Sequence, residues 1–204
     1  VNNNSIDLRK LGRYEEAINE AHLALEASNE KLGENDLEAA EAYNTLGIIN
    51  RQQGNFEMAL EYFGQSLNIR KAKKKKDPLL ISKSYNNMAI VYSVTSDYDQ
   101  ALKYYNETLK IRKQLLGPKH ILLANIYNNM GSLYFEKGAY DSSLIYNEKA
   151  YLIRKDQLGQ HPLTGNSLNN IGASLELIGN YDGALTKYKE ALMIFDEFFK
   201  KKHP

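Results

Sequence analysis

The stretch YNNMGSLYFEKGAY, residues 127–140, has three counterparts elsewhere in the same chain. They are YNTLGIINRQQGNF at 43–56, YNNMAIVYSVTSDY at 85–98 and LNNIGASLELIGNY at 168–181. The first residues of the four stretches are separated by 42, 42 and 41 positions. A fixed period in this range is typical of a solenoid, in which repeated supersecondary units pack on their neighbours.

Two positions of this repeat hold only small side chains, and we call them the crossing positions. They are occupied by Ala17, Ala59, Ala101, Ser143 and Ala184, and by Ala24, Ser66, Thr108, Ala150 and Ala191. Small residues are expected where two helices cross closely, because a larger side chain there would overpack the contact. The pattern therefore predicts that each unit contains helices in close contact.

Each unit is predicted to contain two helices. Tyr127, Met130 and Tyr134 lie at helical spacing on the first helix, and Tyr98, Ala101 and Tyr105 on a second one. Glycines that favour a left-handed cap are expected to end the first helices, at Gly54, Gly138 and Gly179. The residues expected to begin the second helices as N-caps are Asn55, Asp97 and Asn180.

No segment has the pattern of a strand, so the chain is predicted to be all-α. It should form a single array of five helix-turn-helix units, or about ten antiparallel helices, without an internal domain boundary. The approximate units are 1–35, 36–77, 78–119, 120–161 and 162–204. Because His203-Pro204 stands 42 residues after His161-Pro162, we expect the array to be a fragment of a longer protein.

The order of small residue or glycine, aromatic, glycine, aromatic and alanine on paired helices resembles the tetratricopeptide repeat. The usual period of that repeat is about 34 residues. The excess here would add about one turn to each helix. Units that contain Ile-Arg-Lys, Leu-Gly and His-Pro are similar to the kinesin light chain subtype, and Ala89 and Ser96 depart from the glycines expected in the third unit. The resemblance implies a right-handed superhelix whose first helices line a groove that holds a peptide.

Each first helix carries an asparagine at the same place, namely Asn2, Asn44, Asn86, Asn128 and Asn169. We call the last four the ladder asparagines. By the resemblance, this place faces the groove, where an amide could hydrogen-bond a partner's backbone because it both donates and accepts. The second-row asparagines follow one residue later, at Asn3, Asn87, Asn129 and Asn170. The alternative is that both rows only tie neighbouring helices together.

The same mapping predicts further groove-facing residues, namely Lys83, Asn125, Asn166 and Phe135. Some members of the family use lysine and asparagine to clamp a C-terminal carboxylate, but here an asparagine replaces the lysine at the decisive position. A chaperone-tail adaptor is therefore not expected.

Basic residues recur near the ends of the second helices. Arg70, Arg112 and Arg154 are expected to favour the helix dipole and to pair with acids of the next unit, with phosphate or carboxylate recognition as the alternative. The run Arg70–Lys76 is interpreted as a solvated helix end, since no aromatic residues interleave with its lysines.

Composition excludes several classes of function. With 26 basic and 25 acidic residues, the net charge of +1 does not favour nucleic acid or an anionic membrane as a partner. Cysteine is absent, which excludes disulfides and thiolate metal sites. Neither a signal peptide nor a membrane-spanning run is recognised, so a cytoplasmic protein is expected. We expect no cofactor, metal or catalytic residue, because no phosphate loop, HxxxH or GxSxG element is present.

These observations predict a non-catalytic scaffold that binds a peptide or protein segment in its groove. A first alternative is a regulatory or sensory domain of a larger bacterial signalling protein, such as a histidine kinase, a caspase-like protease or a transcription factor. A second is a self-assembly module that forms a homo-oligomer through uncapped ends.

Overall fold

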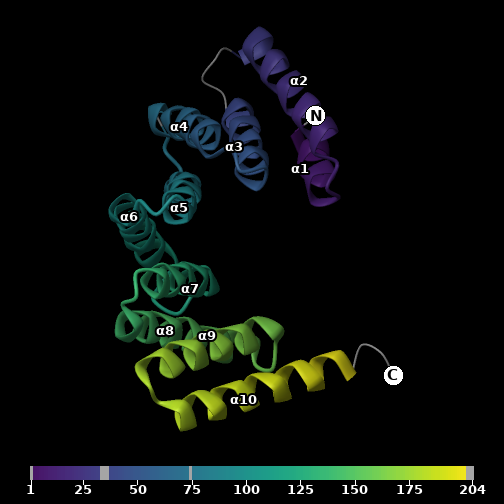
Figure 1. The fold of residues 1–204 in the computed structure, drawn as a ribbon. Coiled ribbons are helices and arrows are strands. Elements are labelled where there is room, and N and C mark those ends of the chain that lie inside the picture. The colour runs from purple at the N-terminus through teal and green to yellow at the C-terminus, as the bar shows by residue number, and fades with distance from the viewer. Residues whose placement is uncertain (1, 33–36, 74, 201–204) are drawn as a thin grey trace. The chain divides into compact units, whose positions relative to one another are not determined.

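In a computed structural model of the chain, the structure describes residues 2–32, 37–73 and 75–200. These residues form ten α-helices and no strand (Figure 1), which confirms the predicted fold class. The helices are α1 (Asn2–Lys10), α2 (Tyr14–Leu32), α3 (Leu37–Gln52), α4 (Phe56–Ala72), α5 (Pro78–Val94), α6 (Tyr98–Leu116), α7 (Ile121–Glu136), α8 (Tyr140–Leu158), α9 (Pro162–Ile178) and α10 (Tyr181–Lys200).

Consecutive helices form antiparallel pairs. Within the pairs, α1 packs on α2, α3 on α4, α7 on α8 and α9 on α10, while α4 contacts α5 and α8 contacts α9. The chain divides into two compact units, Val1–Thr108 and Leu109–Pro204, and the division falls inside α6. None of the helices in the described ranges has the length and apolar character that a membrane crossing requires.

The crossing positions lie in the core, as the sequence predicts. All ten of their side chains are at most 5% exposed. The Ser66 hydroxyl donates to the Ala40 carbonyl of α3 at 2.7 Å, so a polar residue is tolerated here because a backbone acceptor lies within reach. Small side chains at these positions allow the paired helices to approach.

The predicted glycine caps are confirmed. Gly54, Gly138 and Gly179 have φ angles of 83°, 73° and 91°, in the left-handed region where glycine has no Cβ penalty. Ser96 takes the equivalent place after α5 and adopts φ 62° without being glycine. That turn is therefore strained relative to the others.

The predicted N-cap residues precede their helices. Asp97 accepts a hydrogen bond from the Gln100 backbone N–H at 3.3 Å, and Asn180 accepts one from Gly183 at 3.0 Å. Asn55 is the N-cap residue of α4, but its side chain makes no cap hydrogen bond and instead donates to the Asn50 amide oxygen at 3.4 Å.

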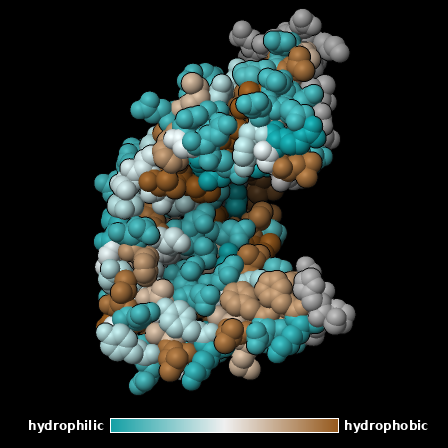
Figure 2. Space-filling model, turned by 45° about the vertical axis from the view of Figure 1, so that its right-hand side comes forward, coloured by the Kyte–Doolittle hydropathy of each residue, from teal (hydrophilic) through white to brown (hydrophobic). Residues whose placement is uncertain are grey.

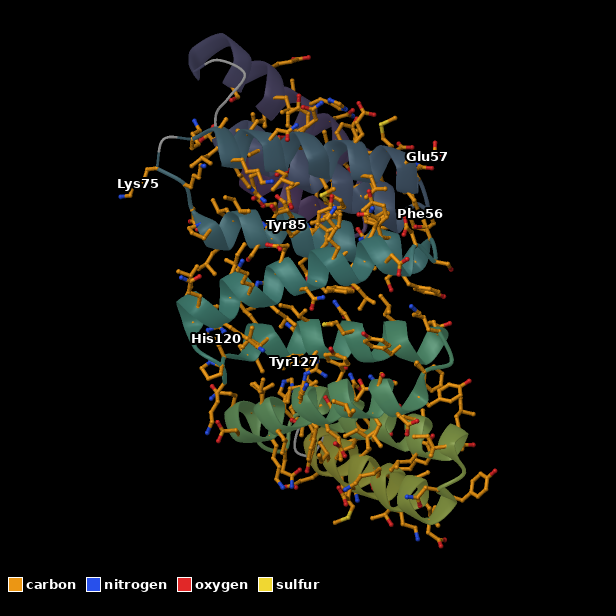
Figure 3. The ribbon with its side chains drawn as sticks, turned by 90° about the vertical axis from the view of Figure 1, so that its left-hand side faces the viewer. Phe56, Glu57, Lys75, Tyr85, His120 and Tyr127 are labelled. Atoms are coloured by element: carbon orange, nitrogen blue, oxygen red, sulfur yellow. The ribbon has the colours of Figure 1, made fainter. Side chains whose placement is uncertain are left out.

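The turns between pairs use other caps. The imidazole Nδ1 of His120 accepts from the Leu122 N–H at 3.2 Å, and His161 does the same with Leu163 at 3.1 Å. His120 lies at the turn before α7, and Tyr127 lies further along that helix (Figure 3). Both histidines therefore serve the turns that start first helices.

Replacing Gly47 should show how closely α3 and α4 approach. A Cβ built on Gly47 would lie 2.6 Å from Phe63 Cε1, and Phe63 is fully buried. We expect Gly47→Ala to lower the free energy of unfolding by about 1–3 kcal/mol through overpacking, measured by urea denaturation. The next pair holds Ala89 at the equivalent position, so the loss at Gly47 is specific to the spacing of this pair.

The matched control is Gly64→Ala in α4, where a Cβ would meet nothing within 4 Å. Because alanine is favoured over glycine in a helix, this variant should be more stable by about 0.5–1 kcal/mol. Equal effects of the two substitutions would contradict the packing described here.

Candidate functional site

The ladder asparagines lie on α3, α5, α7 and α9, and two of them are bonded by the row that follows. The Asn87 amide nitrogen donates to Asn44 Oδ1 at 2.8 Å. In the second compact unit, Leu109–Pro204, the Asn170 amide nitrogen donates to Asn128 Oδ1 at 3.1 Å. In each case an asparagine of one pair bonds the first helix of the preceding pair. These contacts correspond to the inter-unit tie that the sequence left as an alternative.

The ladder asparagines differ in exposure. Asn44 is 1% exposed, and its amide nitrogen lies 3.4 Å from Glu41 Oε1, so no part of it remains open to a partner. Asn86, Asn128 and Asn169 are half-buried and retain some surface. A partner could therefore reach the last three only.

A buried arginine joins neighbouring helix pairs in the first compact unit, Val1–Thr108. Arg70, at the end of α4, is 2% exposed and donates to the Leu80 carbonyl at 3.0 Å and to Ser84 Oγ at 2.7 Å on α5. Its other terminal nitrogen donates to Glu41 Oε2 on α3 at 2.6 Å. Burial lowers the pKa of Arg70 and Glu41 opposes the shift, but a guanidinium stays charged in proteins.

Arg154 makes the corresponding contacts in the second unit with neutral acceptors. It is 5% exposed and donates to the Leu163 carbonyl at 3.1 Å and to Ser167 Oγ at 2.8 Å on α9. On α7 it donates to Asn128 Oδ1 at 3.1 Å and Asn125 Oδ1 at 3.2 Å. Asn125 occupies the place that Glu41 holds in the first unit, so the buried cation is solvated by amide and carbonyl dipoles.

These arginines are therefore more than cations at helix ends. Arg70 and Arg154 each reach back to the first helix of their own pair and forward to the start of the next. Arg112 donates forward to the Leu122 carbonyl at 3.4 Å. The sequence contained a signal for this, because the arginines and the ladder asparagines recur with the same period. Periodicity implied a recurring contact, but it did not indicate which side chains meet.

The other predicted groove residues are more accessible. Asn125 and Asn166 are exposed, and Phe135 is half-buried with its ring edge-on to Tyr140 at 5.4 Å between centroids. The Lys83 ammonium bonds Glu41 Oε1 at 2.5 Å while its side chain is 41% exposed. On the face drawn in Figure 2, hydrophilic and hydrophobic residues are intermixed.

The tyrosines stack between helices. Tyr92 and Tyr104 lie 5.6 Å apart with nearly parallel rings, and Tyr134 and Tyr146 lie 5.2 Å apart. Burial raises the pKa of Tyr92 and of Tyr134, which keeps both phenols neutral. Among the described residues, no cluster of His, Asp and Glu could hold a metal ion.

The basic run Arg70–Lys76 starts in the last turn of α4, and its side chains lie in different surroundings. Lys71 lies with its ammonium 5.1 Å from the centroid of the Tyr85 ring on α5, whereas Lys75 is exposed and points away from the helices (Figure 3). Lys74 lies outside the described residues. The interpretation as a solvated helix end is wrong for Arg70, which is 2% exposed, and it is kept for the exposed Lys75 and Lys76.

The paired helices, the left-handed glycine caps and the recurring inter-pair bonds agree with the match of a family model. The model of the tetratricopeptide repeat matches residues 1–72, 80–156 and 122–197. The chain belongs to the tetratricopeptide repeat family. Tetratricopeptide domains are generally protein–protein interaction modules, and they are typically non-catalytic.

Solved structures share the fold. A putative kinesin light chain with nearly identical TPR-like repeats, from Podosopora anserina, has a TM-score of 0.79 at 14% identity, covering 98% of this chain and 94% of that one. The apo form of RapI has a TM-score of 0.82 at 18% identity, covering 98% and 70%. MamA has a TM-score of 0.66 at 17% identity, covering 96% of each chain. No curated protein matches the sequence.

The difference between Glu41 and Asn125 can be tested by exchange. Asn125→Glu would offer the buried Arg154 a carboxylate like the one that Arg70 already has. We expect it to raise the free energy of unfolding by about 1 kcal/mol or more, since hydrogen bonds to charged groups are the stronger ones. Glu41→Asn should lower it by about 1.5–3 kcal/mol.

Urea unfolding of both variants provides the measurement. The control is Glu148→Asn, which removes an exposed carboxylate from α8 and should change the stability by no more than about 0.5 kcal/mol. A loss of stability in Asn125→Glu would show that amide dipoles suffice for Arg154.

Proposed function

We propose that the protein is a non-catalytic scaffold that holds a peptide or protein segment against its first helices. The observation that carries the proposal is the recurrence of exposed amides at one place on successive first helices, at Asn125 of α7 and Asn166 of α9. An amide offers both a donor and an acceptor to a peptide backbone, whatever the sequence of the peptide.

The hydrogen bonds between helix pairs indicate which asparagines remain available to a peptide. Asn128 Oδ1 already accepts from Asn170 and Arg154, so its role includes holding the pairs together. Asn166 is exposed and Asn169 is half-buried on the same helix, α9. We therefore assign peptide contact first to these asparagines of α9. Asn86, Asn125 and Asn128 come second, because Asn125 Oδ1, like Asn128 Oδ1, already accepts from Arg154.

The test uses peptides selected from a random library on the immobilised protein, because no partner sequence is known. A recovered peptide is titrated calorimetrically against the wild type and against Asn166→Ala combined with Asn169→Ala. At about 1 kcal/mol for each lost hydrogen bond, affinity should fall roughly thirtyfold while the melting temperature stays unchanged.

The matched control is Asn106→Ala, which removes an exposed asparagine from the second helix α6. It should leave peptide affinity unchanged. If no peptide is enriched, or if Asn106→Ala weakens binding as much as the α9 variant, the groove assignment is wrong.

A second candidate is self-association through α10. Large apolar side chains of this helix remain exposed by 52–72%, namely Leu185, Leu192, Met193 and Phe199. Exposed apolar surface of this kind often marks an interaction site. We expect sedimentation velocity to show a dimer that dissociates on dilution and is weakened by Met193→Glu. A monomer at every concentration would eliminate this candidate.

A further inference from the structure

At one position of the repeat, the second helices of three pairs place an aromatic residue, at Phe63, Tyr105 and Tyr188, while the first pair has Ala21. In α8 the residue is Asn147, which is 2% exposed. A Cβ built on Gly47 or Gly172 would collide with the facing ring, and a Cβ built on Gly131 would collide with the Asn147 amide. Asn147 thus occupies the place of a ring with a smaller, polar group.

A recess lies beside Asn147 in the second compact unit. It has a volume of about 120 Å³ and is lined by Ser132, Phe135, Glu136, Asn147, Asn170 and Ala173. A single water needs only about 10–15 Å³ of such space. The recess can therefore accept the head of a side chain.

A chain of hydrogen bonds orients the Asn147 amide. Its nitrogen donates to Ser143 Oγ at 3.2 Å, and Ser143 Oγ lies 2.9 Å from Ser174 Oγ. The Ser174 hydroxyl donates to the Asn170 carbonyl at 3.0 Å, so each hydroxyl in the chain donates once and accepts once. This assignment leaves Asn147 Oδ1 as a buried acceptor without a partner in the protein.

A buried acceptor that lacks a donor is unfavourable by about 1–3 kcal/mol, so the amide is poorly explained by folding alone. The surroundings indicate which donor would fit. The lining includes the Glu136 carboxylate and the Phe135 ring, and it contains no lysine, arginine or histidine. The nearby Glu176 carboxylate already accepts from the Tyr188 hydroxyl at 2.8 Å.

We propose that this recess binds the cationic head of a lysine or arginine side chain of the peptide held on α7 and α9. The head would donate to Asn147 Oδ1 and pair with Glu136, and the pairing with a carboxylate favours a cation over a neutral donor. The aliphatic stem would lie against Phe135. The inference rests on the proposed scaffold function and adds the chemical class of a side chain that the scaffold selects.

The test uses two blocked tripeptides, acetyl-Gly-Lys-Gly-amide and its norleucine analogue, which has the same stem without the charge. Each is titrated into the isotope-labelled protein and followed through the Asn147 side-chain amide and the Gly131 backbone amide by NMR. We expect the lysine peptide to shift both signals at millimolar concentration. The analogue should bind at least about tenfold more weakly, as expected for one lost charged hydrogen bond.

Three variants test separately the Asn147 acceptor, the Glu136 charge and the free volume of the recess. Asn147→Tyr introduces the ring that three other pairs have and should abolish the response of Gly131 while keeping or raising the melting temperature. Asn147→Leu keeps the size but removes the acceptor, and Glu136→Gln removes the charge. Each of these two should weaken the lysine peptide by about tenfold.

Equal affinity for the two tripeptides, a wild-type response in Asn147→Tyr, or no shift at millimolar concentration would overturn the proposal and leave the recess as a water site. The library peptide keeps this result separate from the scaffold function. Full sensitivity of that peptide to the Asn166 and Asn169 substitutions together with indifference to Asn147→Tyr would reject the recess alone.

Discussion

Each helix pair depends on the close approach of two helices at small side chains. The residues at the crossing positions are at most 5% exposed, and any larger side chain there would have to displace a neighbouring backbone. Close approach leaves room for a ring of the second helix to lie against a glycine of the first, as Phe63 does against Gly47. The second helix of one pair then contacts the first helix of the next pair, as α4 contacts α5 and α8 contacts α9.

The bonds between pairs are polar although they are largely buried. Arg70 and Arg154 each use one terminal nitrogen to hold the first turns of the following helix, through a carbonyl and a serine hydroxyl. A buried guanidinium needs several acceptors, because an unpaired one would lose its hydration without replacement. The repeat supplies these acceptors to Arg70 and to Arg154, so the spacing of these two arginines serves the packing of neighbouring pairs.

Much of this fold could be predicted from the sequence, because packing repeats whenever residues repeat. The crossing positions and the left-handed glycines follow from side-chain size and backbone freedom alone. The side-chain partner of the N-cap residue Asn55 could not be predicted in the same way, since its amide has a choice of partners and bonds Asn50. The ladder asparagines pose the same difficulty, because one amide suits a peptide backbone and a neighbouring asparagine equally well. Only the positions of Asn87 and Arg154 decide where their oxygens are used.

Departures from the repeat carry the information that periodicity lacks. In an array whose stability is approximately a sum of unit and neighbour terms, one unit can give up a packing contact without unfolding the rest. Ser96 replaces a glycine at a left-handed turn. Asn147 replaces a ring with a smaller amide beside a recess, and its oxygen is a buried acceptor without a partner in the protein. The first departure affects only the backbone, whereas the second creates a place with a defined size and sign of charge, which is what a selective contact with a partner requires.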